Sequence, residues 1–265
     1  MNKSQVKRHP HRFKINKPLY KNKYFWLCLF GFIIGSAVLR FFLFSDFFQV
    51  KNIQISGNVK ISAGDLENMV NNRVQNNILF FPTKNIFFVS QKKIENEILN
   101  NYPIINTADL TKKMPGTLTL AVKERIAEAV FYSDELYYLI DKQGIIFEPV
   151  SGIDPNYLEI ENLIPINEVR LGNKVVNESE MAKIFEIETA LKNDIKIPIQ
   201  KASIISNERL NIKTFAGWDI YFNTGNEISW QIKMLKLALE KQISQEKQNN
   251  LEYIDLRFGN QIFFR

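Results

Sequence analysis

Residues Tyr24–Phe44 read YFWLCLFGFIIGSAVLRFFLF, and this apolar stretch decides how the rest of the chain is interpreted. Its 21 residues are enough to cross a hydrocarbon core of about 30 Å as an α-helix. Arg40 is its one charged residue, and it lies near enough to the end for its side chain to reach the interface. Tyr24 and Trp26 stand at the other end, where amphipathic rings favour the interface. The stretch is therefore predicted to be a transmembrane helix over residues 24–44, with Tyr24, Trp26 and Arg40 as its interfacial residues.

The residues before this stretch form a basic tail. Met1–Lys23 contains eight Lys and Arg residues and no acidic residue. Positively charged flanks stay on the cytoplasmic side of a membrane. Residues 1–23 are therefore predicted to be a cytoplasmic tail, and everything after about Ser45 to lie outside, as in a single-pass type II protein of the cell membrane.

A cleaved signal peptide is the competing interpretation of the same region. The basic start and the apolar run fit a signal peptide, and Gly35-Ser36-Ala37 offers a small-residue cleavage site. Cleavage there would leave an apolar new N-terminus, VLRFFLFSDFF, with no obvious role. The length and the flanks of the stretch therefore favour an anchor that is not cleaved.

The distribution of charge argues against a nucleic-acid partner. The whole chain has a net charge of +6, but residues 45–265 contain 25 basic residues against all 28 acidic ones. A nucleic-acid-binding protein normally has its basic footprint on the folded domain. The expected partners therefore do not include a nucleic acid, but they do include the lipid bilayer.

The outer region lacks the side chains of most catalytic and metal sites. Both His residues lie in the tail and the single Cys, Cys28, in the apolar stretch, so residues 45–265 contain neither. Ser-His-Asp and Cys-His catalysis and His or Cys metal sites are thereby excluded there, and no cofactor is predicted. Hydrolysis of a wall polymer by paired carboxylates stays open as an alternative, with Asp141 and Glu148 or Glu159 and Glu161 as candidates.

Residues 48–124 are predicted to form a compact α+β module. Alternating apolar residues indicate strands at 48–56, 104–111 and 117–124. Apolar residues at four-residue spacing indicate two helices, which begin after Ser62 and at Ser90. The expected order is β-α-α-β-β, and residues 76–88 between the helices are expected to be a loop with many apolar side chains.

Residues 125–265 are predicted to be a second, β-rich domain. Strands are expected at 126–132, 136–140, 145–147, 202–206, 210–214, 218–223, 251–258 and 261–264, and less clearly at 158–166 and 169–176. Helices are expected at 177–192 and at 227–246, the second being long and amphipathic. Lys123-Glu124-Arg125, at the boundary, has the composition of a solvated hinge. The fold class is α+β.

Four segments of the outer region carry a resemblance to a known family. They read VKNIQISGN at Val50–Asn58, PGTLTLAVKER at Pro115–Arg125, LIDKQGIIFE at Leu139–Glu148 and LEYIDLRFGNQIFF at Leu251–Phe264. In this order, behind a single apolar stretch, they resemble the FtsQ/DivIB family of bacterial cell-division proteins over the whole chain. The resemblance implies a POTRA module at 48–124 and an FtsQ/DivIB-like domain at 125–265.

The same resemblance implies a role in septation that is not enzymatic. Proteins of this family join the division apparatus and bind two other single-pass proteins, an FtsB-like one (DivIC in some bacteria) and an FtsL-like one. That complex helps to recruit and regulate the septal peptidoglycan synthase. The chain is therefore expected to be a divisome scaffold at the division septum.

The resemblance also indicates where a partner binds. In the family, the strand after the DLR motif lies at the sheet edge and pairs with a segment of FtsB, and the matching segment here is Phe258–Phe264. An edge strand has unpaired backbone groups, so strand addition there is physically plausible. Arg257 can instead pair with Asp255 or Glu252 on its own strand. The predicted partner-binding residues are Tyr253, Arg257, Phe258, Gly259, Gln261, Ile262, Phe263 and Phe264.

The residues alone leave the faces of this last strand open. Either Ile262 and Phe264 or Gln261 and Phe263 face the core, because a slip of one residue exchanges the two faces. Phe263 and Phe264 can also be core residues that close the sheet, since aromatic side chains in strands usually serve packing.

Overall fold

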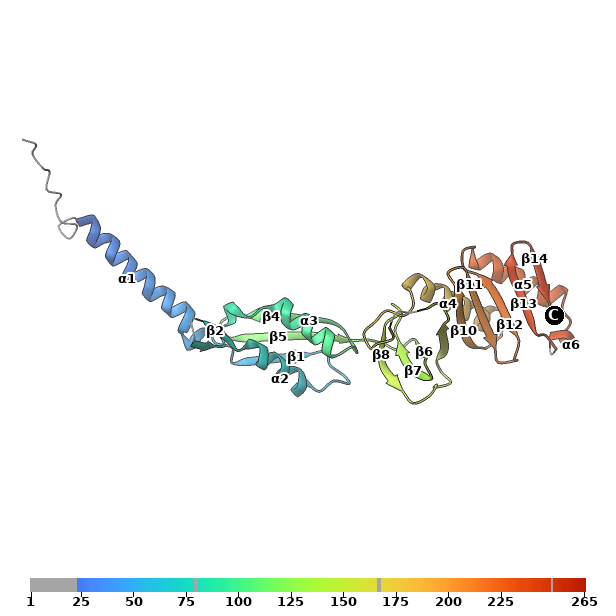
Figure 1. The fold of residues 1–265 in the computed structure, drawn as a ribbon, viewed down its shortest axis with the longest axis horizontal. Coiled ribbons are helices and arrows are strands. Elements are labelled where there is room, and N and C mark those ends of the chain that lie inside the picture. Colours follow the sequence, from blue (N-terminus) through green and yellow to red (C-terminus); the bar gives the residue numbers. More distant parts are fainter. Residues whose placement is uncertain (1–22, 79–80, 166–167, 249) are drawn as a thin grey trace, which may run out of the picture. The chain divides into compact units, whose positions relative to one another are not determined.

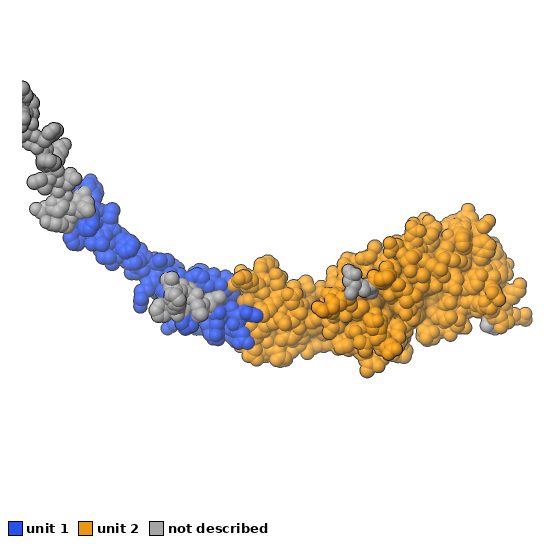
Figure 2. Space-filling view, in the orientation of Figure 1, with its two compact units in different colours: residues 1–53, 71–89, 112–118 blue, residues 54–70, 90–111, 119–265 orange. Residues whose placement is uncertain are grey.

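The computed structural model describes residues 23–78, 81–165, 168–248 and 250–265 (Figure 1). These residues divide into two compact units (Figure 2). The first unit contains the described residues of 23–53, 71–89 and 112–118, and the second those of 54–70, 90–111 and 119–265. Apart from Lys23, the predicted basic tail lies outside the described residues.

The first unit begins with helix α1, Lys23–Phe44. It is long and apolar enough to cross a membrane, the one such helix in the described part of the chain, and none of its residues is buried. Tyr24, Trp26 and Arg40 are exposed on it. The predicted apolar N-terminal helix is confirmed, and it fits a membrane anchor.

The chain leaves α1 through a short helical turn rather than a strand. Ser45 accepts a hydrogen bond from the Phe47 N–H through its hydroxyl oxygen and caps the 3-10 helix η2, Asp46–Phe48. Strand β1 begins only at Asn52 and runs to Ser56. The predicted start of this strand at residue 48 is wrong, because the capped turn occupies the position.

The predicted loop at 76–88 is also wrong. Strands β2, Asn76–Ile78, and β3, Phe81–Thr83, pair antiparallel, and the 3-10 helix η3, Ile86–Phe88, follows. Each strand has three residues, which is too short for an alternating pattern to appear in the sequence. The tip of this hairpin lies outside the described residues.

The order of elements in the region 48–124 follows the prediction. Helices α2, Ala63–Val74, and α3, Gln91–Asn101, come between β1 and the strands β4, Ile105–Lys113, and β5, Thr117–Glu124. The sheet has the strand order β1-β5-β4. The β-α-α-β-β order is therefore confirmed, with the β2-β3 hairpin inserted between the helices.

A nine-stranded sheet dominates the second unit. Its strand order is β14-β13-β12-β11-β10-β9-β6-β7-β8, and the β6-β9, β9-β10 and β12-β13 pairs are parallel. The strands are β6 Ala129–Ser133, β7 Leu136–Ile140, β8 Ile146–Val150, β9 Leu158–Asn162, β10 Ile199–Ser206, β11 Arg209–Thr214, β12 Asp219–Asn223, β13 Tyr253–Phe258 and β14 Gln261–Phe264.

Two helices share one hydrophobic core with this sheet. Helix α4, Glu178–Ala190, precedes β10, and helix α5, Ile228–Lys241, precedes β13. Every second residue of the central strands is buried, as the burial of β11 and β12 illustrates. The core combines side chains from both helices and several strands, among them Ile184, Ile187, Leu235, Ile212, Phe222 and Ile254. The β-rich domain with helices is confirmed.

Several predicted bounds in this unit are wrong, among them the start of β6, at Ala129 rather than 126, and the start of β10, at Ile199 rather than 202. Helix α5 ends at Lys241, five residues early, because Ile243 turns back into the core and its N–H bonds to the Ala238 carbonyl. A short helix α6, Gln245–Gln248, follows. The predicted strand at 158–166 is shorter in the structure, where only β9 forms. The predicted strand at 169–176 is absent from the described residues, which form only an isolated bridge there, between Lys174 and Ile145.

The region at Lys123-Glu124-Arg125 is not a solvated hinge. The Arg125 guanidinium forms an ion pair of 2.5 Å with Asp141, and their side chains are only 11% and 6% exposed. The Arg125 Nε also donates to the Pro103 carbonyl at 3.0 Å. These bonds join residues of the segments 90–111 and 119–265, which belong to the same unit.

Glu124 makes a second fixed contact in the same region. Its carboxylate accepts hydrogen bonds from the backbone N–H groups of Val59, Lys60 and Ile61 at 2.8 to 3.1 Å. Burial alone would raise the pKa of Glu124, but these bonds outweigh burial and hold the pKa below its usual value. The turn after β1 is thereby tied to the end of β5.

Candidate partner-binding site

The last strand lies at one end of the nine-stranded sheet. β14 pairs antiparallel with β13, with Phe264 opposite Ile254 and Phe263 opposite Asp255. The two strands are joined by Gly259-Asn260, and Gly259 has a φ of 65°, a left-handed conformation that suits a residue without a side chain. The sheet order places no strand on the other side of β14 in the described residues.

The backbone hydrogen bonds fix which groups of β14 point outward. Arg265 exchanges two hydrogen bonds with Tyr253, at 3.2 and 3.4 Å, so its N–H and C=O face β13. Successive residues of a strand direct these groups to opposite sides. The N–H and C=O of Phe264, and by the same alternation those of Ile262, therefore point away from the sheet.

The opposite edge of the sheet is less open. Ile146 of β8 donates its N–H to the Asn173 carbonyl at 3.2 Å and accepts the Gly172 N–H at 2.7 Å. Pro149 in the same strand has no N–H to offer. An incoming strand would meet blocked or missing groups along β8, whereas β14 offers unpaired ones.

The side chains of β14 show which face of the strand points toward the core. Ile262 packs against the core, and Phe264 lies opposite the buried Ile254, so these two occupy the core face. Phe263 lies on the other face, where its ring meets that of Phe258 edge to face at 5.2 Å. Phe258, Phe263 and Phe264 are 56%, 49% and 37% exposed, so the alternative that Phe263 and Phe264 are core residues is contradicted.

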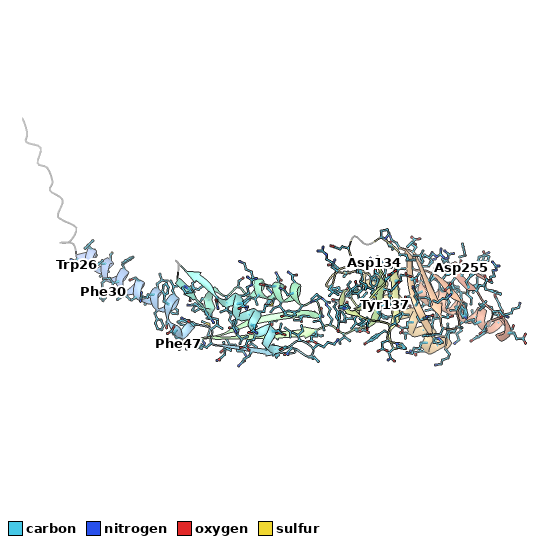
Figure 3. All side chains as sticks on the ribbon, turned by 60° about the horizontal axis from the view of Figure 1, so that its bottom comes forward. Trp26, Phe30, Phe47, Asp134, Tyr137 and Asp255 are labelled. Carbon is cyan, nitrogen blue, oxygen red and sulfur yellow. The ribbon has the colours of Figure 1, made fainter. Side chains whose placement is uncertain are left out.

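Arg257 is held by its own strand. Its Nε and Nη2 donate to the two carboxylate oxygens of Asp255 at 2.8 and 2.6 Å, as one alternative predicted. Figure 3 labels Asp255 on this part of the sheet. Burial would raise the pKa of Asp255, but the bonds from Arg257 outweigh burial and lower it. The hydrogen bond to Asp255 in turn raises the pKa of Arg257.

Tyr221 lies beside the predicted site residues Tyr253 and Arg257, although the sequence did not identify it as a site residue. Its ring stacks on Tyr253 at 5.4 Å, and the guanidinium groups of Arg209 and Arg257 lie 5.0 and 5.5 Å from its centre. The alternation in 218–223 indicates only that Tyr221 faces away from Ile220 and Phe222. Its partners follow from the parallel pairing of β12 with β13, which local sequence does not encode.

The carboxylates of the hydrolase alternative are each paired with a cation. Asp141 bonds to Arg125, and Glu148 to Lys60 at 2.6 Å. Glu159 and Glu161 line an open hollow of about 570 Å³, but both bond to Lys201, at 3.0 and 2.8 Å. All four carboxylates are therefore already engaged in ion pairs. Across the described ranges, no group of three or more His, Cys, Asp or Glu residues could hold a metal ion.

Two family models match consecutive parts of the chain. The model described as "POTRA domain, FtsQ-type" matches residues 48–125, and "Cell division protein FtsQ/DivIB, C-terminal" matches residues 129–257. Together they cover most of residues 45–265. The second match ends at Arg257, so β14 lies beyond it.

Several curated proteins are similar over much of their length. The cell division protein DivIB of Clostridium acetobutylicum is 25% identical over 226 residues, which are 82% of this chain and 83% of the relative. DivIB of Clostridium botulinum strain Loch Maree is 27% identical over 250 residues, 89% of both chains. The cell division protein FtsQ of Syntrophotalea carbinolica is 26% identical over 155 residues, 54% of this chain and 51% of the relative.

Proposed function

Since the chain belongs to the FtsQ/DivIB family of cell-division proteins, we propose that it is a membrane-anchored divisome scaffold that works by binding rather than by catalysis. Its partners are an FtsB/DivIC-like and an FtsL-like single-pass protein, through which it is linked to septal peptidoglycan synthesis. Helix α1 serves as an uncleaved anchor with the N-terminus in the cytoplasm, and the rest of the chain acts outside, at the division septum.

The observation that carries this proposal is the open edge of β14. An extended segment of the FtsB/DivIC-like partner adds to the sheet as a further strand and pairs with the outward N–H and C=O groups of Ile262 and Phe264. Main-chain bonds of this kind give affinity for an extended partner, and the side chains beside the edge give selectivity.

The exposed side chains around the edge supply that selectivity. Phe258 and Phe263 offer apolar surface on one face of the hairpin, and Phe264 offers it on the other. Tyr253 and Arg257 lie beside them, and the bonds to Asp255 fix the position of the guanidinium. Aromatic and Arg side chains held in place in this way are the residue types that dominate binding energy in interfaces.

A binding measurement with matched variants tests the proposal. The full chain in lipid nanodiscs is mixed with the outer domain of the FtsB/DivIC-like protein of the same organism. Phe264→Glu places a charge at the open edge and is expected to weaken binding at least tenfold. Leu136→Glu, the same kind of change at a residue 56% exposed on β7, is expected to leave binding unchanged.

Circular dichroism of both variants shows whether the fold is kept. Equal binding by the Phe264→Glu variant and the unmodified chain would reject the edge as the binding site. Release of sugar or peptide from purified peptidoglycan by the unmodified chain, with loss in a Glu159→Gln variant, would favour the hydrolase alternative over the scaffold.

A further inference from the structure

A cluster of aromatic rings surrounds the point where α1 ends. Phe48 is its centre, with Phe42 stacked on it at 5.2 Å, Phe87 at 5.2 Å and Phe47 at 5.1 Å. Only Phe48 is buried, whereas Phe47 and Phe87 are 56% and 47% exposed and Phe88 is 40% exposed. All five residues belong to the first unit. Figure 3 shows Phe47 beyond the end of the helix on which Trp26 and Phe30 are labelled.

The segment that carries Phe87 and Phe88 is fixed to the end of α1. The side-chain amide of Asn85, which is fully buried, donates to the carbonyl oxygens of Phe42 and Leu43 at 2.7 and 3.1 Å. These carbonyls belong to the last turn of the helix, which has no partner for them within the helix. The Val50 N–H also bonds to the Lys84 carbonyl at 2.9 Å. Asn85 therefore ties the segment that carries Phe87 and Phe88 to the end of the helix.

The length of α1 sets the depth of this cluster. Its 22 residues span about 33 Å, which matches a hydrocarbon core of about 30 Å. Phe42 is the third residue from its end, and the Phe87 ring lies 6.2 Å from the Phe42 ring. The polar interface extends several ångströms beyond the hydrocarbon on each side. A ring this close to the end of the span falls within that interface.

The exposed side chains near the end of α1 are of the kinds that favour a membrane interface. Aromatic rings embed at the boundary between headgroups and acyl chains. Lys84 lies on the same segment as Phe87, and Lys112 of β4 donates a hydrogen bond through its Nζ to the Phe87 carbonyl at 3.4 Å. Long Lys side chains can direct their charge to lipid phosphates while their stems stay on apolar surface. Asp46, the acidic residue of the turn, is bonded to the Gln49 side-chain amide at 2.8 Å.

We propose that Phe47, Phe87 and Phe88 form a membrane-interface surface that inserts into the outer leaflet beside α1. The η3 segment, inserted between the two helices of the POTRA module, is then a lipid-binding element. This inference rests on the proposed anchoring of α1 in a membrane.

Nitroxide labels at single cysteines measure the depth of each site in the bilayer. The full chain is placed in nanodiscs of phosphatidylcholine and phosphatidylglycerol, in a Cys28→Ser background. Phe88→Cys labels the proposed surface while leaving Phe47 and Phe87 in place. Ile33→Cys labels the middle of α1, and Leu136→Cys labels an exposed hairpin of the second unit. The ratio of each label's accessibility to dissolved oxygen and to a water-soluble nickel chelate gives the depth of that label in the bilayer.

The expected depth at residue 88 lies between those at residues 33 and 136. The Phe47→Ser/Phe87→Ser pair is expected to shift the label at residue 88 to the aqueous value, whereas Phe215→Ser, at a Phe 60% exposed in the second unit, is expected to cause no shift. An aqueous value at residue 88 with residue 33 deep in the bilayer would overturn the inference and leave the anchor intact. Aqueous values at both would overturn the anchor as well.

Discussion

At the residue scale, the carboxylate of Glu124 joins the end of β5 to the turn after β1. Its carboxylate satisfies the backbone N–H groups of Val59, Lys60 and Ile61. Hydrogen bonds to a charged group contribute about 1.5 to 3 kcal/mol. Glu124→Ala is therefore expected to lower the free energy of unfolding by about 2 kcal/mol, whereas Glu124→Gln, which keeps an acceptor, is expected to cost less. Thermal unfolding of the full chain in detergent, followed by Trp fluorescence, compares the two variants.

The buried ion pair of Arg125 and Asp141 is expected to matter more. Removing one partner of a buried pair leaves an uncompensated charge and costs about 3 to 5 kcal/mol. Asp141→Ala is expected to lower the unfolding free energy by about this much. Glu148→Ala breaks the more exposed pair with Lys60 and is expected to cost under about 1 kcal/mol. Equal decreases in unfolding free energy in the two variants, in the same unfolding assay, would show that the Arg125–Asp141 pair does not stabilise this region more than the exposed pair does.

The Asp255 carboxyl gives stability a pH dependence. Its pKa is lower in the folded protein than in the unfolded chain, so the folded state binds the proton less readily. The Arg257 pair therefore adds stability above the unfolded value of about 4, and this contribution is lost as the pH falls through the lower folded value. Unfolding measured between about pH 6 and pH 3 should show a steeper loss in the unmodified chain than in Asp255→Asn. Parallel curves would contradict the assignment.

At the scale of elements, the turn before β8 depends on a glycine without room for a side chain. Gly144 has a φ of 79°, and a Cβ there would collide with the Val176 carbonyl. Gly217 has a φ of 96° but nothing near the same position. Gly217→Ala is expected to cost about 1 kcal/mol for the backbone conformation alone, and Gly144→Ala a further 1 to 3 kcal/mol. Similar unfolding temperatures for both variants would show that the turn relaxes to admit the methyl group.

Elements with a regular apolar pattern could be predicted from the sequence, and the three-residue strands β2 and β3 could not. Helix α3 and strand β5 appear close to where the apolar spacing indicated. The β2-β3 hairpin went unrecognised because three residues show no period. Helix α5 was predicted too long because Ile243 continues the apolar spacing after the chain has turned. A buried side chain looks the same in a sequence whether a helix or a turn brings it to the core.

At the scale of the whole molecule, the sequence indicated which parts the chain has but not how their side chains meet. The hairpin β13-β14 followed from its alternation and from Gly259-Asn260. Which faces of β14 lie inward, and the stacking of Tyr221 on Tyr253, depend on the pairing of distant strands. The clamp of Asn85 on the end of α1 joins residues more than forty positions apart, so local sequence contains no sign of it.

The proposed strand addition makes a residue-specific claim about β14. The partner is expected to cover the outward amides of Ile262 and Phe264, while the Phe263 amide already faces β13. Amide hydrogen exchange of the full chain in nanodiscs, with and without the FtsB/DivIC-like outer domain, measures this directly. Exchange at Ile262 and Phe264 is expected to slow at least tenfold on binding, with little change at Phe263. Binding that leaves Ile262 and Phe264 unprotected would contradict strand addition at this edge.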